Sequence, residues 1–182
     1  MTVLENPATS STGLAFLFST IAALGEQGWP SWWAQLKAND VKVAAGWEDA
    51  YYIDFSGSSG HGQYPIVLSY SSSPADEIDD DGLSRTVSLN NECFRQIEYA
   101  GVLKNAKNPE GARAFIKFMQ SKDFQSALPE ANYVYPIVKG IKLPDAWARF
   151  AKPADSFVDV SNLDFDANRR IWQKKWAEIM AG

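Results

Sequence analysis

The chain has 182 residues and a formal net charge of −5, and 46% of its residues are hydrophobic. This length accommodates one domain or two small ones, and 7 Trp, 7 Tyr and 10 Phe suffice for a hydrophobic core. The acidic balance argues against a nucleic-acid partner, because nucleic acids require a basic face. Cys93 and His61 are each the single residue of their type, which excludes an internal disulfide and a cluster of Cys and His metal ligands.

The first element in chain order is a loop rich in hydroxyl groups that leads into an apolar helix. Residues 6–13 read Asn-Pro-Ala-Thr-Ser-Ser-Thr-Gly, and residues 14–18 are apolar. The free N–H groups and peptide dipoles of a first helical turn favour an anion such as phosphate or carboxylate. Ser and Thr are also ordinary helix caps. Both interpretations, cap and anion site, stay open for Ser10, Ser11 and Thr12.

Helices and strands then alternate along the first half of the chain. We expect the first helix to cover residues 11–24, with Gly25 just beyond its end, and a second helix to begin at Pro30 and stop near Asn39. Alternating polarity predicts a short strand at 41–43. A turn and short helix follow at 46–52, and the apolar run 65–69 is typical of a strand buried on both faces.

A composition break at 71–82, rich in Ser and acidic residues, is interpreted as a crossover between two structural units. A strand is predicted at 94–103. The next helix begins after its cap Asn108, and its inner face is predicted to comprise Ala112, Phe115, Ile116 and Met119. The remaining predicted elements are a short helix at 123–127, an aromatic loop at 132–136, a short helix at 144–150 and an amphipathic helix at 166–180, whose apolar side carries Ile171, Trp172, Trp176 and Ile179. The alternation indicates an α/β layer fold.

Patterns typical of catalysis are missing from the sequence. It contains no Gly-x-Ser-x-Gly elbow, Walker loop or dinucleotide fingerprint. His61 stands in the Gly/Ser loop 56–62, a poor place for a positioned base. The acidic run 76–81 lacks the Gly and terminal Glu of an EF-hand. We therefore expect a binding protein with no catalytic residues, metal or cofactor.

A set of aromatic residues stands at predicted loops and element ends: Trp47, Tyr51, Tyr52, Tyr70, Tyr133 and Tyr135. Aromatic rings at such positions suit a flat or cationic ligand, through stacking and cation–π attraction. Beside the hydroxyl loop, this set predicts a site that holds an anion at one end and an aromatic cation at the other.

The segment 6–14 resembles the D-P-x-T-S-[ST]-x-G-L segment of thiamine-binding proteins, the solute receptors of thiamine ABC importers. Further similar blocks follow in the same order at 46–51, 68–74, 96–102, 132–136 and 168–176. The similarity therefore covers nearly the whole chain.

This resemblance implies an α/β fold, the C-terminal portion of a two-lobed periplasmic binding protein of type II, with a mixed sheet flanked by helices. Residues 1–74 would form part of the second lobe and carry the anion loop. Residues 75–182 would form the crossover and a return segment that contributes to the first lobe and the closing helices. The implied function is extracytoplasmic capture of thiamine or its phosphate esters for the membrane permease of an ABC importer. The first residues show no signal-peptide pattern, so we expect the signal segment to lie outside this sequence.

The resemblance also implies roles for individual residues. Ser10, with Ser11 and Thr12 nearby, would face the phosphate end of the ligand, and Trp47 and Tyr70 would line the cleft around thiamine. Tyr133 stands where some relatives carry Trp and would stack on the ligand. Asp76 replaces a Tyr that some relatives have near the ligand.

Three other functions remain open at this point. A ferric-iron or other anion receptor of the same fold is suggested by the pair Tyr51-Tyr52, although ferric receptors carry their tyrosine pair after the strand that corresponds to 66–68, where this chain has only Tyr70. An enzyme that processes thiamine phosphates would need a nucleophile and a base. An interaction module would use its exposed aromatic residues against a partner chain.

Overall fold

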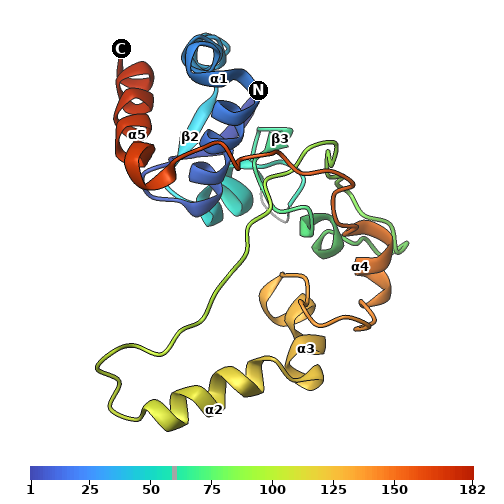
Figure 1. The fold of residues 1–182 in the computed structure, drawn as a ribbon. Coiled ribbons are helices and arrows are strands. Elements are labelled where there is room, and N and C mark those ends of the chain that lie inside the picture. Colours follow the sequence, from blue (N-terminus) through green and yellow to red (C-terminus); the bar gives the residue numbers. More distant parts are fainter. Residues whose placement is uncertain (59–60) are drawn as a thin grey trace.

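The structure, a computed structural model, describes residues 1–58 and 61–182. Its sheet has the strand order β2-β1-β3, with β1 (Thr2–Glu5) between β2 (Lys42–Ala44) and β3 (Ile66–Val67). Val3 stands opposite Lys42 on one side and Val67 on the other, and both pairings are parallel. The α/β class is confirmed. A mixed sheet was expected, but the three described strands pair only in parallel. Their carboxyl ends therefore lie at one edge of the sheet. Figure 1 labels β2 and β3 of this sheet.

Helix α1 (Ser11–Ala38) follows β1 and bends sharply at Gly25, where φ is 68° and ψ is 171°. The predicted break at Gly25 is confirmed, because Gly adopts a positive φ without steric penalty. The prediction that the next helix begins at Pro30 is wrong. The helix resumes directly after Gly25, so Pro30 lies inside it, and the helix ends at its C-cap Asn39.

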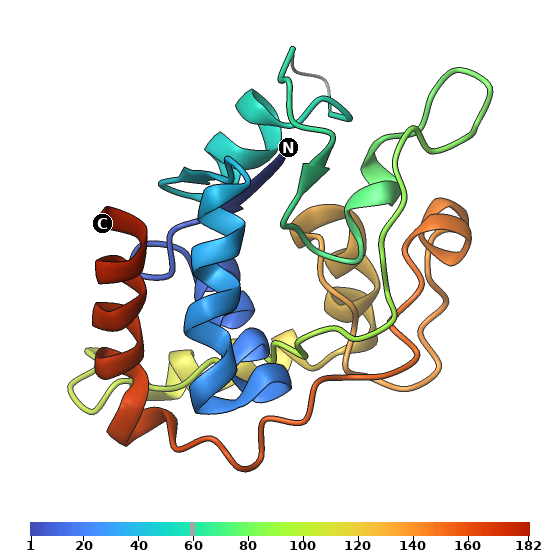
Figure 2. The same ribbon diagram turned by 90° about the horizontal axis from the view of Figure 1, so that it is seen from above.

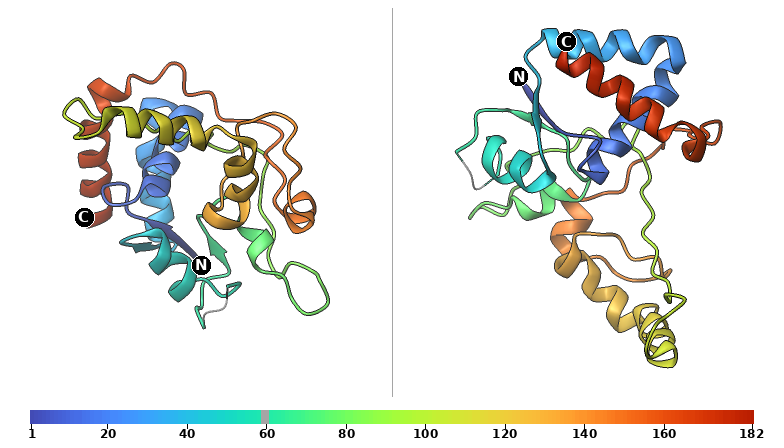
Figure 3. Two further views of the ribbon diagram at one scale, coloured as in Figure 1. Left: turned by 90° about the horizontal axis from the view of Figure 1, so that it is seen from below. Right: turned by 90° about the vertical axis from the view of Figure 1, so that its left-hand side faces the viewer.

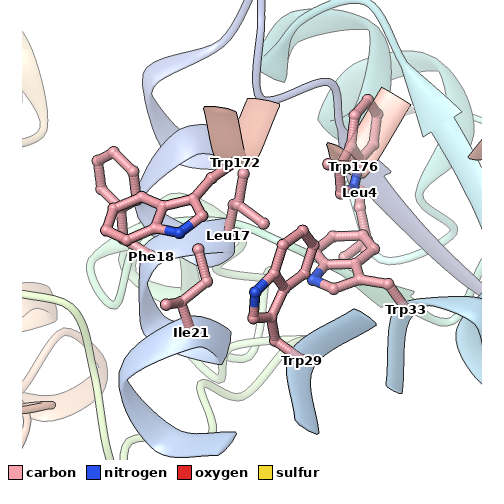
Figure 4. Packing of buried hydrophobic residues seen from close by; sticks show 8 residues of the cluster. All are labelled: Leu4, Leu17, Phe18, Ile21, Trp29, Trp33, Trp172 and Trp176. Carbon is pink, nitrogen blue, oxygen red and sulfur yellow. The ribbon is translucent and has the colours of Figure 1, made fainter. Parts of the chain in front are cut away.

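Each face of the sheet has its own cover. Helix α5 (Phe165–Ala181) lies beside α1 on one face (Figure 2), and the two helices bury a cluster that comprises Leu4, Leu17, Phe18, Ile21, Trp29, Trp33, Trp172 and Trp176 (Figure 4). On the other face Val3 packs with Ala44 and with Ala50 of the π-helical turn η1 (Asp49–Asp54). Successive residues of β1 thus point to opposite layers, as the pleat of a strand requires.

The remaining helices lie apart from the sheet. The 3-10 helix η2 (Ser73–Asp76) packs on α4 (Asp145–Phe150) through Ala75, Trp147 and Ala151. Helices α2 (Pro109–Met119) and α3 (Lys122–Asn132) contact each other, and they lie below α4 in the view of Figure 1 and in the right-hand view of Figure 3. The predicted cap is confirmed, since the side chain of Asn108 accepts a hydrogen bond from the Gly111 N–H at 2.9 Å.

Four expectations about strands and apolar helix faces are wrong. The strand expected at 65–69 shortens to β3, and its Ile66 is exposed because β3 lies at the edge of the three-stranded sheet. Residues 94–103 run without forming a strand, since no described segment pairs with them in a ladder. The apolar face of α2 is largely uncovered, and Phe115 is 57% exposed. On α5, Trp172 and Trp176 are buried as expected, whereas Ile171 is exposed.

His61 is exposed, as expected for the Gly/Ser loop, while Ser59 and Gly60 of that loop lie outside the described residues. In the described part of the chain, no helix combines the length and apolar character needed to cross a membrane.

Candidate functional site

The loops that leave the carboxyl ends of the three parallel strands meet at one edge of the sheet. The Asn6 N–H donates to the carbonyl of Ala44 at 2.9 Å, and the Thr9 hydroxyl donates to the carbonyl of Ala45 at 2.6 Å. These bonds tie the loop after β1 to the loop after β2. Open α/β sheets bind ligands at this edge. The fold therefore brings together residues that lie far apart in the sequence.

The hydroxyl loop forms the entrance to α1. Ser10 is the N-cap residue, and its Oγ accepts a hydrogen bond from the Gly13 N–H at 3.4 Å. Ser10 is half-buried and Ser11 is exposed. A Cβ on Gly13 would lie 2.4 Å from the carbonyl oxygen of Glu5, so the first turn of α1 packs directly on the end of β1. The capping role is confirmed, and contact of this loop with an anion stays a prediction.

Thr12 faces inward, whereas Ser11 before it is exposed. Its hydroxyl donates to Glu5 Oε2 at 2.7 Å and lies 2.7 Å from Ser10 Oγ. Thr12 is 7% exposed and Glu5 is 1% exposed. Burial raises the pKa of Glu5 to about 7, although the hydrogen bond from Thr12 works in the opposite direction. The side chain predicted to face the ligand thus supports the loop from within.

An aromatic cluster stands at the ends of β2 and β3. Trp47 stacks on Tyr51, with ring centroids 4.8 Å apart and planes inclined by 17°. The ring of Tyr70 lies 5.8 Å from Trp47, and that of Tyr52 meets Trp47 edge-on at 5.3 Å. The Trp47 indole N–H donates to Ser69 Oγ at 2.8 Å, which fixes the ring relative to β3. Trp47 is half-buried and Tyr70 is 36% exposed, so both rings keep an accessible part.

Tyr70 connects the aromatic cluster to the hydroxyl loop. Partial burial raises the pKa of its phenol, a hydrogen bond with the Ser11 side chain opposes this rise, and the negative charges of Glu98 and Glu5 add to it. Tyr70 therefore joins Ser11 and Trp47 in one group at the carboxyl edge of the sheet.

Tyr133 borders the cluster from a different helix. It is the C-cap of α3 in the left-handed conformation, with φ of 55°, and its carbonyl accepts a hydrogen bond from Ser72 Oγ at 3.0 Å. Burial raises the pKa of Tyr52, and the phenol of Tyr133 and the carboxylate of Asp76 raise it further. Tyr133 and the exposed Asp76 therefore lie on the Tyr52 side of the cluster.

Acidic groups accompany these aromatic rings. Partial desolvation raises the pKa of Asp76 to about 6, and the neighbouring Glu77 adds to this effect. Glu77 is buried and forms an ion pair with Arg85 at 3.3 Å. Negative charge beside aromatic faces is suited to a cationic ligand.

Sequence reasoning did not identify Glu5 or Ser69 as parts of this site. A signal existed for Glu5, because it is a single charged residue that ends the apolar run 3–4 directly before the hydroxyl loop. Ser69 lies in a segment already singled out, but its bond to Trp47 joins residues 22 positions apart and leaves no local pattern.

Two pockets elsewhere on the described surface contain none of the predicted site residues. One lies against Pro74, Thr86 and Arg149, and the other against Phe16, Trp32 and Glu92. Across residues 1–58 and 61–182, no cluster of three or more His, Cys, Asp or Glu residues could hold a metal ion.

Comparisons with known proteins agree with this architecture. Residues 2–133 match the family model described as bacterial extracellular solute-binding protein. The chain is 32% identical to a thiamine-binding periplasmic protein of Salmonella typhimurium over 98% of its own length and 53% of that protein. It is 28% identical to iron uptake protein A2 of Synechocystis over 88% of its own length and 49% of that protein. A solved structure of a periplasmic thiamin binding protein superposes with a TM-score of 0.81 at 26% identity, covering 98% of this chain and 54% of that one.

The chain thus spans about half the length of the relatives it matches. The family model covers well over half of the chain, including the sheet, the hydroxyl loop and the aromatic cluster. By this match, the chain belongs to the family of bacterial extracellular solute-binding proteins.

Proposed function

We propose that this chain forms the part of an extracytoplasmic solute-binding protein that captures thiamine or a phosphate ester of thiamine for uptake. The observation that carries the proposal is the meeting of the hydroxyl loop and the aromatic cluster at one sheet edge, through Ser11, Tyr70 and Trp47. Thiamine has flat rings, one of them cationic, and its esters end in phosphate. The aromatic cluster and its acidic neighbours are suited to the flat, cationic rings, and the N-terminus of α1 is suited to the phosphate.

The proposal extends to the partner and to the organisation of the chain. A captured vitamin requires a membrane permease, and we propose an ABC-type importer as this partner. Residues 1–74 would contribute to one lobe and carry the anion loop, while residues 75–182 would supply the crossover, a return segment for the other lobe and the closing helices. The packing of α5 on α1 is compatible with this arrangement, since a closing helix then returns to the lobe that contains the sheet.

Ferric-iron binding is the second candidate, favoured by the similarity to an iron uptake protein. The geometry of the tyrosine pair opposes it. The Tyr51 hydroxyl donates to the carbonyl of Ser73 at 3.5 Å, and burial raises the pKa of this phenol, whereas an iron ligand must lose its proton readily. Addition of ferric citrate to the purified protein should therefore produce no phenolate-to-iron colour. A visible charge-transfer band would favour iron.

We further propose binding without catalysis. The carboxyl group bonded to the hydroxyl loop, that of Glu5, contacts the buried Thr12 and not an exposed hydroxyl. A general base must reach the proton that it removes. Incubation with thiamine monophosphate should consequently release no inorganic phosphate.

The main test is calorimetric titration of thiamine and its monophosphate into two polypeptides. One is the chain of residues 1–182. The other, the longer polypeptide, joins this chain to a segment that corresponds to the part of the relatives that residues 1–182 do not match. We expect weak or absent binding to the first and tight binding to the second, because enclosure excludes water and adds contacts from a second wall. Equal affinities would contradict the shared cleft, and no binding to either polypeptide would contradict the proposed function.

A further inference from the structure

A buried carboxyl group lies directly beneath the hydroxyl loop. Glu5 ends the central strand β1 and is 1% exposed. Its Oε2 accepts a hydrogen bond from Thr12, while its Oε1 is buried and has no hydrogen-bond partner. A buried carboxylate with one unpartnered oxygen is energetically unfavourable, since desolvation penalises the charge. The position therefore favours uptake of a proton.

The hydrogen bonds from Glu5 to the loop form a chain whose direction depends on that proton. With Glu5 ionised, Thr12 donates to Glu5 and Ser10 donates to Thr12, so the Ser10 hydrogen points inward. With a proton on Oε2, Glu5 donates to Thr12 and Thr12 donates to Ser10. The Ser10 oxygen already accepts from the Gly13 N–H, so its own hydrogen then becomes free to point outward.

We propose that Glu5 is a positioning residue that couples proton uptake to anion binding at the hydroxyl loop, so that phosphate-bearing ligands are favoured when Glu5 is protonated. Two effects act in the same direction. Protonation removes a negative charge behind the loop, and it releases the Ser10 hydrogen as a donor to the anion. Only the identity of the phosphate ester rests on the proposed function, because the coupling itself applies to any anion held by the loop.

The surroundings of Glu5 determine its protonation. Burial raises the pKa of its carboxyl to about 7, within the physiological range. Tyr70, from the loop after β3, is a titratable neighbour of Glu5. The negative charges of Glu5 and Glu98 both raise the pKa of its phenol. On the other neighbouring strand, Lys42 at the start of β2 forms an ion pair with Asp54 at 2.5 Å. Thr12 supplies the contact from α1.

The test uses the longer polypeptide, which is expected to bind thiamine tightly. The Glu5 carboxyl carbon is titrated by nuclear magnetic resonance, with 13C-labelled glutamate and with Glu5→Gln to assign the signal. Sulfate is the first probe, because it remains a dianion throughout the pH range and its own charge does not change. Thiamine and thiamine monophosphate are the second and third probes, with chloride at equal ionic strength as the reference. Sulfate and thiamine monophosphate should raise the pKa of Glu5 by about one unit, and thiamine should not. This shift corresponds to a roughly tenfold gain in anion affinity from high to low pH.

Two variants separate the coupling from a general structural effect. Glu5→Gln keeps the shape and carries an amide donor toward Thr12, so its sulfate affinity should be independent of pH and roughly fivefold above that of the native protein at pH 8. Glu98→Gln, which removes an exposed carboxylate near Tyr70, should leave the native pH profile unchanged.

The outcomes are distinguishable. If sulfate does not change the pKa of Glu5, or if thiamine shifts it as much as thiamine monophosphate does, the coupling is refuted. If thiamine monophosphate binds without shifting the pKa, the proposed function stands and the coupling fails. If sulfate raises the pKa while neither thiamine compound binds, the coupling stands and the proposed function fails.

Discussion

Trp47 lies face to face with Tyr51, four residues further along the chain, with ring centroids 4.8 Å apart. The π-helical turn η1 presents Tyr51, which is buried, and Trp47 rests on it as the more accessible ring. The bond to Ser69 holds the indole from the other side. Trp47 is therefore pre-positioned, so a ligand that stacks on it need not order a mobile side chain.

Replacement of Trp47 should weaken binding of thiamine in the longer polypeptide. We expect Trp47→Ala to reduce affinity at least tenfold, or about 1.4 kcal/mol, because the stacking surface is removed. Calorimetry measures the effect. Phe115→Ala, which removes an exposed ring on α2, is the matched control and should bind as the native protein does. Equal losses for both variants would show that Trp47 does not touch the ligand.

Gly13→Ala should destabilise the protein. Its Cβ would meet the backbone of Glu5 at 2.4 Å, and a backbone group cannot move aside as a flexible side chain can. Overpacking of this kind costs about 1–3 kcal/mol in the free energy of unfolding. Urea unfolding followed by tryptophan fluorescence tests this. Gly101→Ala has open space around its Cβ and should change stability little. A Gly13→Ala protein of native stability would contradict the close contact between α1 and β1.

The free energy of unfolding should depend on pH through the protonation of Glu5. Its pKa rises from the ordinary glutamate value of 4.5 to about 7 in the fold, so the folded state holds the proton more tightly than the unfolded chain. The free energy of unfolding should therefore fall as pH rises from about 4.5 to about 7, by roughly 3 kcal/mol. Glu5→Gln lacks this contribution. The difference between native and variant, measured by urea unfolding at several pH values, should grow through this window and then level off. A constant difference would contradict the burial of an ionisable Glu5.

A buried hydrogen bond between Trp33 and Thr20 within α1 should contribute to stability. The Trp33 indole N–H donates to Thr20 Oγ1 at 2.9 Å, and both residues are buried. Thr20→Val keeps the shape but leaves the indole donor without a partner, which should lower the free energy of unfolding by about 1–3 kcal/mol. Ser19→Ala is the matched control, since the Ser19 hydroxyl bonds to the carbonyl of Ala15 within the same helix and is half-buried. Thermal unfolding of both variants shows whether Thr20→Val loses more stability than Ser19→Ala.

Local sequence determined much of this protein. The hydroxyls before an apolar run predicted the cap at Ser10, Gly25 predicted the helix break, and Asn108 predicted the cap of α2. Each depends on a few neighbouring residues and on backbone preferences that act over one turn. The resemblance of collinear blocks predicted the family, which the match over residues 2–133 shows.

Tertiary structure alone decided which segments find partners. The apolar residues of 94–103 and the apolar face of α2 favour burial, yet a strand needs a neighbour to pair with, and a helix face needs a layer to cover it. The site also depends on the fold, because parallel pairing of β1 with β2 and β3 brings Ser11, Trp47 and Tyr70 to one edge. The burial of Glu5 likewise cannot be predicted from local sequence. Its residue type favours solvent, and only the packing of α1 over the end of β1 buries it and raises its pKa, since desolvation is a property of the surroundings and not of the residue.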